Sequence, residues 1–79
     1  MHTADIYRKL TPIFREVFDD DQLVVVPHLA AADVAEWDSL RHIRLVLSIE
    51  REFSLRFSAA EIGALENVGE FVDLIRAKL

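Results

Sequence analysis

The sequence of 79 residues predicts an all-α fold: a four-helix bundle with three main helices, one short third helix and a long loop between the first two. Two observations support this expectation. Apolar residues recur at helical spacing almost throughout the chain, and the one run that resembles a strand has no second strand to pair with. A chain of this length forms a single domain, residues 1–79, which buries too little surface to enclose a deep active site easily.

The first helix is expected over residues 4–18. Pro12 lies in its interior, where proline removes a backbone hydrogen bond and disfavours the helical state of Thr11. Either the helix kinks there, or Thr11 caps a shorter helix with Pro12 at its first position. We favour one kinked helix, because an amphipathic apolar stripe runs straight through the proline. The stripe consists of Ile6, Leu10, Ile13, Phe14, Val17 and Phe18.

Residues 19–37 are expected to form a long connection. Its apolar run, residues 23–26, ends at Pro27, and we interpret it as an extended loop that packs apolar side chains on the core. Val34 and Trp37 are expected to pack in the same way, with contact to a partner protein as the alternative for Trp37. A loop this long in so small a domain is uncommon and is usually functional.

Capping signals predict where the later helices begin. Asp38 is a good N-cap, so the second helix is expected to start at Ser39 and to run to about Phe53. Residues 58–61 form a capping-box pattern that predicts a short helical turn. Residues 67–70 are a looser version of that pattern and open the last helix. One face of this last helix is apolar, with Val68, Phe71, Val72, Ile75 and Leu79.

The second helix has an apolar arc that covers more than half of its circumference, at about 100° per residue. One interpretation is a well-buried central helix. The other divides the arc into a core face and an exposed apolar stripe, and exposed stripes usually mark binding surfaces. The core face would hold Leu45, Val46, Ile49 and Phe53. The stripe would hold Leu40, Ile43 and Leu47.

The net charge of −5 argues against general nucleic-acid binding and favours partners with positive patches. Residues 39–57 are nevertheless locally basic, and the polar sector of the second helix is either a solvated surface or the rim of an interface. This sector contains Arg41, Arg44, Ser48, Arg51 and Glu52. The sequence has no cysteine, which excludes disulfides and zinc-thiolate sites. It has no signal-peptide pattern and no apolar run of membrane-spanning length, so we expect a cytoplasmic protein, and from its size and charge we expect a monomer.

The segment Trp37-Asp38-Ser39-Leu40, with a helix that ends in residues 48–53 (Ser-Ile-Glu-Arg-Glu-Phe), resembles the acyl carrier protein family. In that family an Asp-Ser-Leu triplet opens the second helix. The triplet alone is a weak signal, but its offset, the Glu-x-Glu-Phe twelve residues into the helix and the chain length make the resemblance specific. It covers nearly the whole chain and implies an acyl-carrier-like bundle.

The resemblance implies that Ser39 bears a covalent 4′-phosphopantetheine arm derived from coenzyme A, with Asp38 as the helix N-cap beside it. Acyl groups would ride on the arm as thioesters, and the carrier itself would have no catalytic residue. The implied partners are a phosphopantetheinyl transferase and enzymes that load and process the acyl group. The phosphate would lie near the helix N-terminus, where amide groups and the macrodipole favour negative charge.

One departure from the family concerns partner recognition. Family members typically have acidic residues along this helix, whereas Arg41, Arg44 and Arg51 stand here. We therefore hypothesise a specialised carrier with dedicated partners, in a fatty-acid, polyketide or secondary-metabolite pathway. The expected partner-binding residues are Leu40, Arg41, Ile43, Arg44, Leu47 and Arg51.

The family also shelters acyl chains in a pocket between helices. By resemblance, the pocket is expected to involve His42, Leu45, Val46 and Ile49. His42 is either at the mouth of that pocket or a partly buried histidine with an ordinary hydrogen bond.

Other functions are less consistent with the residues. A hydrolase would need a base aimed at the Ser39 hydroxyl and a glycine-rich turn, and neither is present. The acidic run of residues 19–21 has neither the glycine nor the terminal glutamate of a calcium loop, and the histidines are scattered. A peptidyl or aryl carrier and an arm-free interaction module remain as alternatives.

Overall fold

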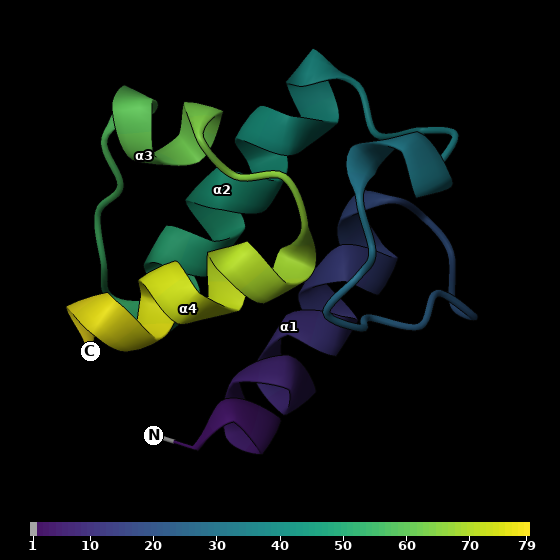
Figure 1. Cartoon of the computed structure of the whole chain (residues 1–79). Helices are drawn as coiled ribbons and strands as arrows, with labels where there is room; N and C mark the ends of the chain where they lie inside the picture. The colour runs from purple at the N-terminus through teal and green to yellow at the C-terminus, as the bar shows by residue number, and fades with distance from the viewer. Residues whose placement is uncertain (1) are drawn as a thin grey trace.

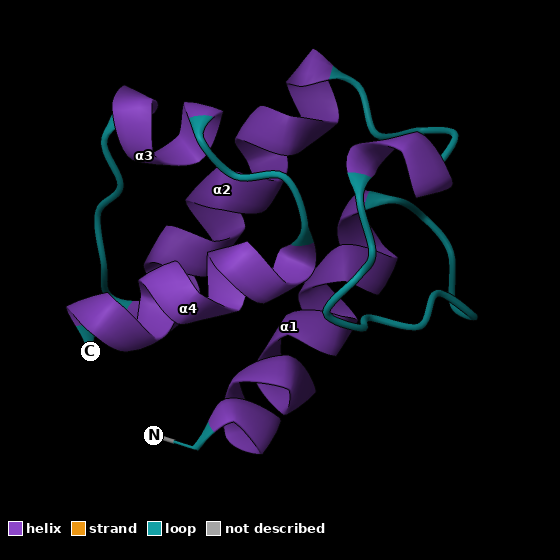
Figure 2. Cartoon of the chain, viewed as in Figure 1, coloured by secondary structure: helices purple, strands orange, loops and turns teal. Residues whose placement is uncertain are grey.

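The computed structural model describes residues 2–79 and confirms the all-α class (Figure 1). Its elements are α1 (Thr3–Val17), the 3-10 turn η1 (Ala31–Asp33), α2 (Ser39–Phe53), α3 (Ala59–Gly63) and α4 (Val68–Lys78). Within the described residues there is no strand (Figure 2). This arrangement confirms the predicted three main helices, short third helix and long first loop. The 3-10 turn inside that loop was not predicted. Within residues 2–79, none of the helices has the length and apolar character needed to cross a membrane.

The first helix continues through Pro12 as one element, so the alternative of a shorter helix that starts at Pro12 is wrong. Thr11 is not a cap, because its hydroxyl donates to the Tyr7 carbonyl at 2.8 Å inside the helix. Pro12 is exposed, so the Arg8 carbonyl that loses its amide partner lies on the exposed side of the helix, where water can bind it. Asp19 follows the helix end in the left-handed region, with φ 51°, which aspartate tolerates better than most residues.

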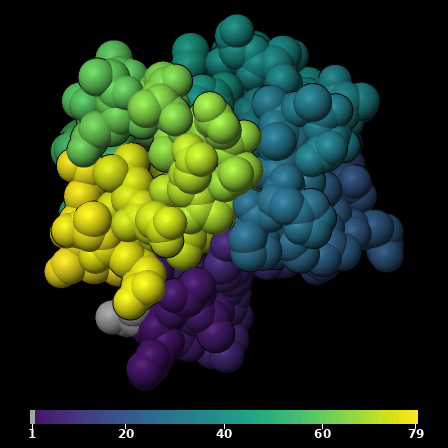
Figure 3. Space-filling view, viewed as in Figure 1, coloured from purple at the N-terminus to yellow at the C-terminus, as the bar shows by residue number. Residues whose placement is uncertain are grey.

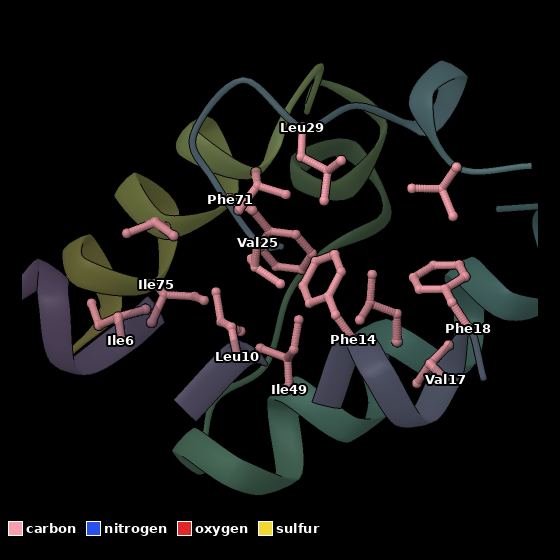
Figure 4. Close-up of a cluster of buried hydrophobic side chains, with 14 of the residues drawn as sticks. Ile6, Leu10, Phe14, Val17, Phe18, Val25, Leu29, Ile49, Phe71 and Ile75 are labelled. Atoms are coloured by element: carbon pink, nitrogen blue, oxygen red, sulfur yellow. The ribbon is translucent and has the colours of Figure 1, made fainter. Parts of the chain in front are cut away.

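The core is built from α1, α2, α4 and the long loop, without a buried side chain from α3 (Figure 4). No polar or charged side chain of the described residues is buried. The predicted apolar face of α4 is confirmed except at Leu79, which follows the last turn and is 53% exposed. The buried residues are Ile6, Leu10, Phe14, Val17, Phe18, Val25, Leu29, Val34, Leu45, Ile49, Phe53, Val68, Phe71, Val72 and Ile75.

The long loop packs on the core as predicted, and its backbone is bonded to the start of α4. The amides of Val68 and Gly69 donate to the carbonyls of Leu29 and Pro27, both at 2.9 Å. Figure 3 shows this part of the loop, in blue, against the segment that opens α4. A Cβ at position 69 would lie 3.1 Å from the Pro27 carbonyl oxygen, so glycine permits the close approach. Val24 departs from the expectation, because it is 64% exposed.

The short helix α3 is held at its ends. The capping box is confirmed: the Ser58 amide donates to the Glu61 carboxylate at 2.8 Å, and the Glu61 amide donates to the Ser58 hydroxyl at 3.1 Å. Lys78 of α4 pairs with Glu61 at 3.0 Å. The Ser58 amide, followed by Lys78, lowers the pKa of the Glu61 carboxyl. Because α3 contributes only partly buried side chains to the core, it is the helix least anchored by apolar packing.

Two leucines of α2 provide a matched test of the packing. Leu45 is fully buried and Leu47 is 52% exposed. We expect Leu45→Ala to lower the free energy of unfolding by about 2–5 kcal/mol, since it leaves a cavity in the core. Leu47→Ala should change it by no more than about 0.5 kcal/mol. Urea unfolding followed by circular dichroism measures both, and equal losses would contradict the assignment of the two faces.

Candidate functional site

Ser39 occupies the first position of α2 and is exposed. The helix begins there because Asp38 has an extended backbone, with φ −101° and ψ −178°, and its carboxylate accepts a hydrogen bond from the Arg41 amide at 2.8 Å. This confirms Asp38 as the N-cap. The cap therefore presents the Ser39 hydroxyl at the rim of the helix N-terminus.

The helix N-terminus favours an anion at this position. The first amides of a helix have no intrahelical acceptor, and the cap satisfies that of Arg41, which leaves the Ser39 and Leu40 amides. These amides and the macrodipole attract negative charge. The negative charge of the Asp38 carboxylate repels an anion at this position. The Arg41 guanidinium lies 3.7 Å from the second oxygen of that carboxylate and partly offsets its charge. A phosphate ester on the Ser39 oxygen thus fits the local electrostatics.

Ser39 lies at a surface hollow of about 460 Å³, formed where α2, the loop before it and the end of α3 meet. A second hollow of about 450 Å³ follows between α2 and α3, which lie side by side in Figure 1. The two hollows share His42, Ile43, Ile62 and Gly63, so they adjoin. A largely apolar path therefore leads from Ser39 along the groove between these two helices.

The four expected pocket residues fall on two different faces. His42 and Val46 line the hollow between α2 and α3. Leu45 and Ile49 do not line it, because the helical turn directs them into the central core, where both are fully buried. Figure 4 shows Ile49 among the core side chains. Glu50 also lines the hollow, although it was not predicted there from the sequence. Its carboxylate accepts a hydrogen bond from the Phe57 amide at 2.8 Å.

His42 is half-buried and forms an ordinary hydrogen bond, which confirms one of its two expected placements, and it lies where the two hollows meet. The Trp37 indole N–H donates to His42 Nδ1 at 3.1 Å, and the two rings stack with centroids 6.1 Å apart. Trp37 also contacts Phe14 and Phe18, at centroid distances of 5.8 and 5.2 Å. The loop residue Trp37 thereby connects the core to the site.

Asp38, Ser39 and His42 are the residue types of a hydrolytic triad, but they are not arranged as one. Asp38 caps the Arg41 amide, and His42 Nδ1 is occupied by the Trp37 indole. Within residues 2–79, no hydrogen bond joins Ser39 to His42. In the same part of the chain, no group of three or more histidine, aspartate or glutamate side chains is placed to hold a metal ion.

The divided arc of α2 is confirmed by exposure. Leu40, Ile43 and Leu47 are 68%, 56% and 52% exposed. Leu45, Ile49 and Phe53 are buried, and Val46 is half-buried. Beside the exposed stripe, Arg44 and Arg51 are exposed, whereas Arg41 is half-buried.

Comparison with known proteins finds no matching family model. The chain is 28% identical, over 79 residues, to an acyl carrier protein of Thermosynechococcus vestitus, with 100% of this chain and 98% of that protein covered. It is 43% identical to the holo acyl carrier protein of Geobacter metallireducens, whose structure was determined by solution NMR. That alignment covers 91% of this chain and 83% of the other, with a TM-score of 0.86.

The cap at Asp38 is testable with two substitutions. Asp38→Ala should lower the free energy of unfolding by about 1 kcal/mol, because the Arg41 amide loses its acceptor. Asp38→Asn keeps an acceptor oxygen and should lose much less. Urea unfolding gives the stabilities, and hydrogen exchange of the Arg41 amide, faster only in the alanine variant, locates the effect. Equal loss in both variants would show that the charge, rather than the cap, stabilises the helix start.

Proposed function

The chain belongs to the acyl carrier protein family, and on that premise we propose that Ser39 carries a 4′-phosphopantetheine arm that presents acyl groups as thioesters to partner enzymes. The main supporting observation is the exposed Ser39 hydroxyl at the first position of α2, held there by the Asp38 cap. In this proposal the chain has no catalytic role. Its residues hold the arm and present it.

The residues around Ser39 suit attachment of the arm. In the loading reaction the Ser39 oxygen bonds to a phosphorus atom of coenzyme A, while the bond between its two phosphates breaks and the nucleotide half leaves. We assign the serine proton to a base on the transferase, since within residues 2–79 no side chain is hydrogen-bonded to the Ser39 hydroxyl. The product is an anionic phosphodiester beside the Ser39 and Leu40 amides. The bound arm supplies a thiol, which this cysteine-free chain lacks.

We assign shelter of the acyl chain to the hollow between α2 and α3. It adjoins Ser39, and its walls include Val46, Ile62 and Phe57. Helix α3 has no buried side chain, so displacement of α3 disrupts less apolar packing than displacement of any other helix. His42 stands where the two hollows meet and would contact the first part of the cargo. These features support an apolar cargo.

The exposed surface of α2 supports docking of partner enzymes beside Ser39. The partners would be a phosphopantetheinyl transferase and the enzymes that load and process the acyl group. The apolar stripe supplies the contact area, and the arginines beside it supply charge. The proposed contact residues are Leu40, Arg41, Ile43, Arg44, Leu47 and Arg51. Arginines on a helix that is acidic in typical family members support a specialised fatty-acid, polyketide or secondary-metabolite pathway.

Incubation with coenzyme A and a broad-specificity phosphopantetheinyl transferase, followed by intact mass measurement, tests the attachment. We expect a gain of one phosphopantetheine group in the wild type and none in Ser39→Ala, which lacks the nucleophilic oxygen. Ser48→Ala is the matched control, because it removes a serine hydroxyl from the same helix and should still be loaded.

A gain in Ser39→Ala would place the arm elsewhere. Failure of the wild type with several transferases would favour the arm-free interaction module instead.

A further inference from the structure

Four residues form a single ridge along the exposed side of α2. Leu40, Arg44, Leu47 and Arg51 follow one another at intervals of four, three and four residues, so at about 100° per residue they lie within about 60° of each other. All four are exposed. The ridge alternates apolar and cationic side chains over about 17 Å of helix length, at 1.5 Å per residue.

The two arginines of this ridge have no acidic partner. Within residues 2–79, neither Arg44 nor Arg51 has a carboxylate within ion-pair distance. Their helical neighbours three and four residues away offer none, since these are Leu40, Leu47, Ser48, Ser54, Leu55 and Arg41. The charge of the ridge is therefore available to a partner.

Nearby acids on the same helix are neutralised by contacts within the chain. Glu50 accepts from the Phe57 amide at 2.8 Å and lies 3.9 Å from Arg56, and its side chain is only 11% exposed. Glu52 pairs with Lys9 of α1 at 3.5 Å. The electrostatic character of the ridge is consequently positive, although the chain as a whole has a net charge of −5.

Arg41 is not part of this free charge. Its guanidinium lies 3.7 Å from the Asp38 carboxylate and 3.5 Å from the Glu36 carbonyl oxygen. The N-terminal end of α2 is thus nearly balanced in charge, and the unpaired positive charge lies farther along the helix. Of the three arginines singled out in the sequence, Arg44 and Arg51 are the ones that face solvent without a partner.

A third arginine, Arg56, lies beyond the ridge but is paired with Glu50 at 3.9 Å, so it adds no unpaired charge. A hollow of about 480 Å³ adjoins the C-terminal end of the ridge, and its lining residues include Leu47 and Arg51 as well as the paired Glu50 and Arg56. The Arg56 side chain is 91% exposed. Side chains of a partner have room to enter this hollow beside Arg51.

From these observations, and resting on the carrier function proposed above, we infer that the enzymes which dock on α2 present carboxylates beside an apolar surface. Their docking faces are acidic, with Asp or Glu opposite Arg44 and Arg51 and apolar side chains over Leu40 and Leu47. A basic docking face would place like charges opposite each other and lose affinity. The sign of the ridge charge therefore selects partners.

An enzyme that loads Ser39 contacts this ridge as well. Arg51 lies about 18 Å along the helix axis from Ser39, at 1.5 Å per residue. A standard protein interface covers about 800 Å² on each partner. A footprint of that size, centred near Ser39, includes Arg44 and comes close to Arg51, so the loading rate reports the match of charges.

The test compares two charge reversals with the same net charge. The ridge variant carries both Arg44→Glu and Arg51→Glu. The control variant carries both Arg8→Glu and Arg76→Glu, which change exposed arginines of α1 and α4. The kcat/KM for loading of Ser39 from coenzyme A is measured with a phosphopantetheinyl transferase of basic docking face, and with a version whose docking Lys and Arg are reversed to Glu. Urea midpoints confirm that both carrier variants are folded.

We expect the basic transferase to load the ridge variant about tenfold faster than the control variant, a typical size for electrostatic steering. The acidic version should load the control variant faster than the ridge variant. Both differences should shrink between 0.01 M and 1 M salt, as the Debye length falls from about 30 to 3 Å. Equal rates for the two variants, or faster loading of the control by the basic enzyme, would overturn the inference while the carrier function stands. No loading of either variant or of the wild type would overturn the carrier function itself.

Discussion

The hydrogen bond from the Arg41 amide to the Asp38 carboxylate is the contact on which the rest of the site depends. It determines the residue at which α2 begins, while the burial of Leu45, Ile49 and Phe53 in the core determines which way the faces of the helix point. With the start at Ser39, the hydroxyl lies beside free helix amides, Leu45 and Ile49 enter the core, and Leu40, Arg44, Leu47 and Arg51 face solvent.

The central helix combines three tasks that larger proteins distribute over several elements. One face packs on α1 and completes the core, a second lines the hollow next to α3, and a third forms the exposed ridge. A chain of 79 residues has few elements to share these tasks, and this explains why the apolar arc of α2 is so wide. The short α3, anchored by its capping box and Lys78, forms one wall of the hollow and contributes only partly buried side chains to the core.

The features predictable from the sequence are those set by local physics. Asp38, Ser58 and Asn67 mark the helix starts through their capping side chains, and apolar spacing separates Leu45 from Leu47. Features that depend on contacts between distant segments were not predictable in detail. Three such features follow from packing in three dimensions: the Trp37–His42 hydrogen bond, the exclusion of Leu45 and Ile49 from the hollow, and the hydrogen bond from the Phe57 amide to Glu50.

The central claim is that Ser39 carries a phosphopantetheine arm with an acyl group in the living cell. The most direct measurement is tandem mass spectrometry of the protein purified from its own organism, before and after hydroxylamine treatment, which cleaves thioesters. The account predicts that the peptide containing Ser39 bears phosphopantetheine, and that a fraction also bears a mass which hydroxylamine removes. A Ser39 peptide that is always unmodified, or an arm on another serine, would contradict it.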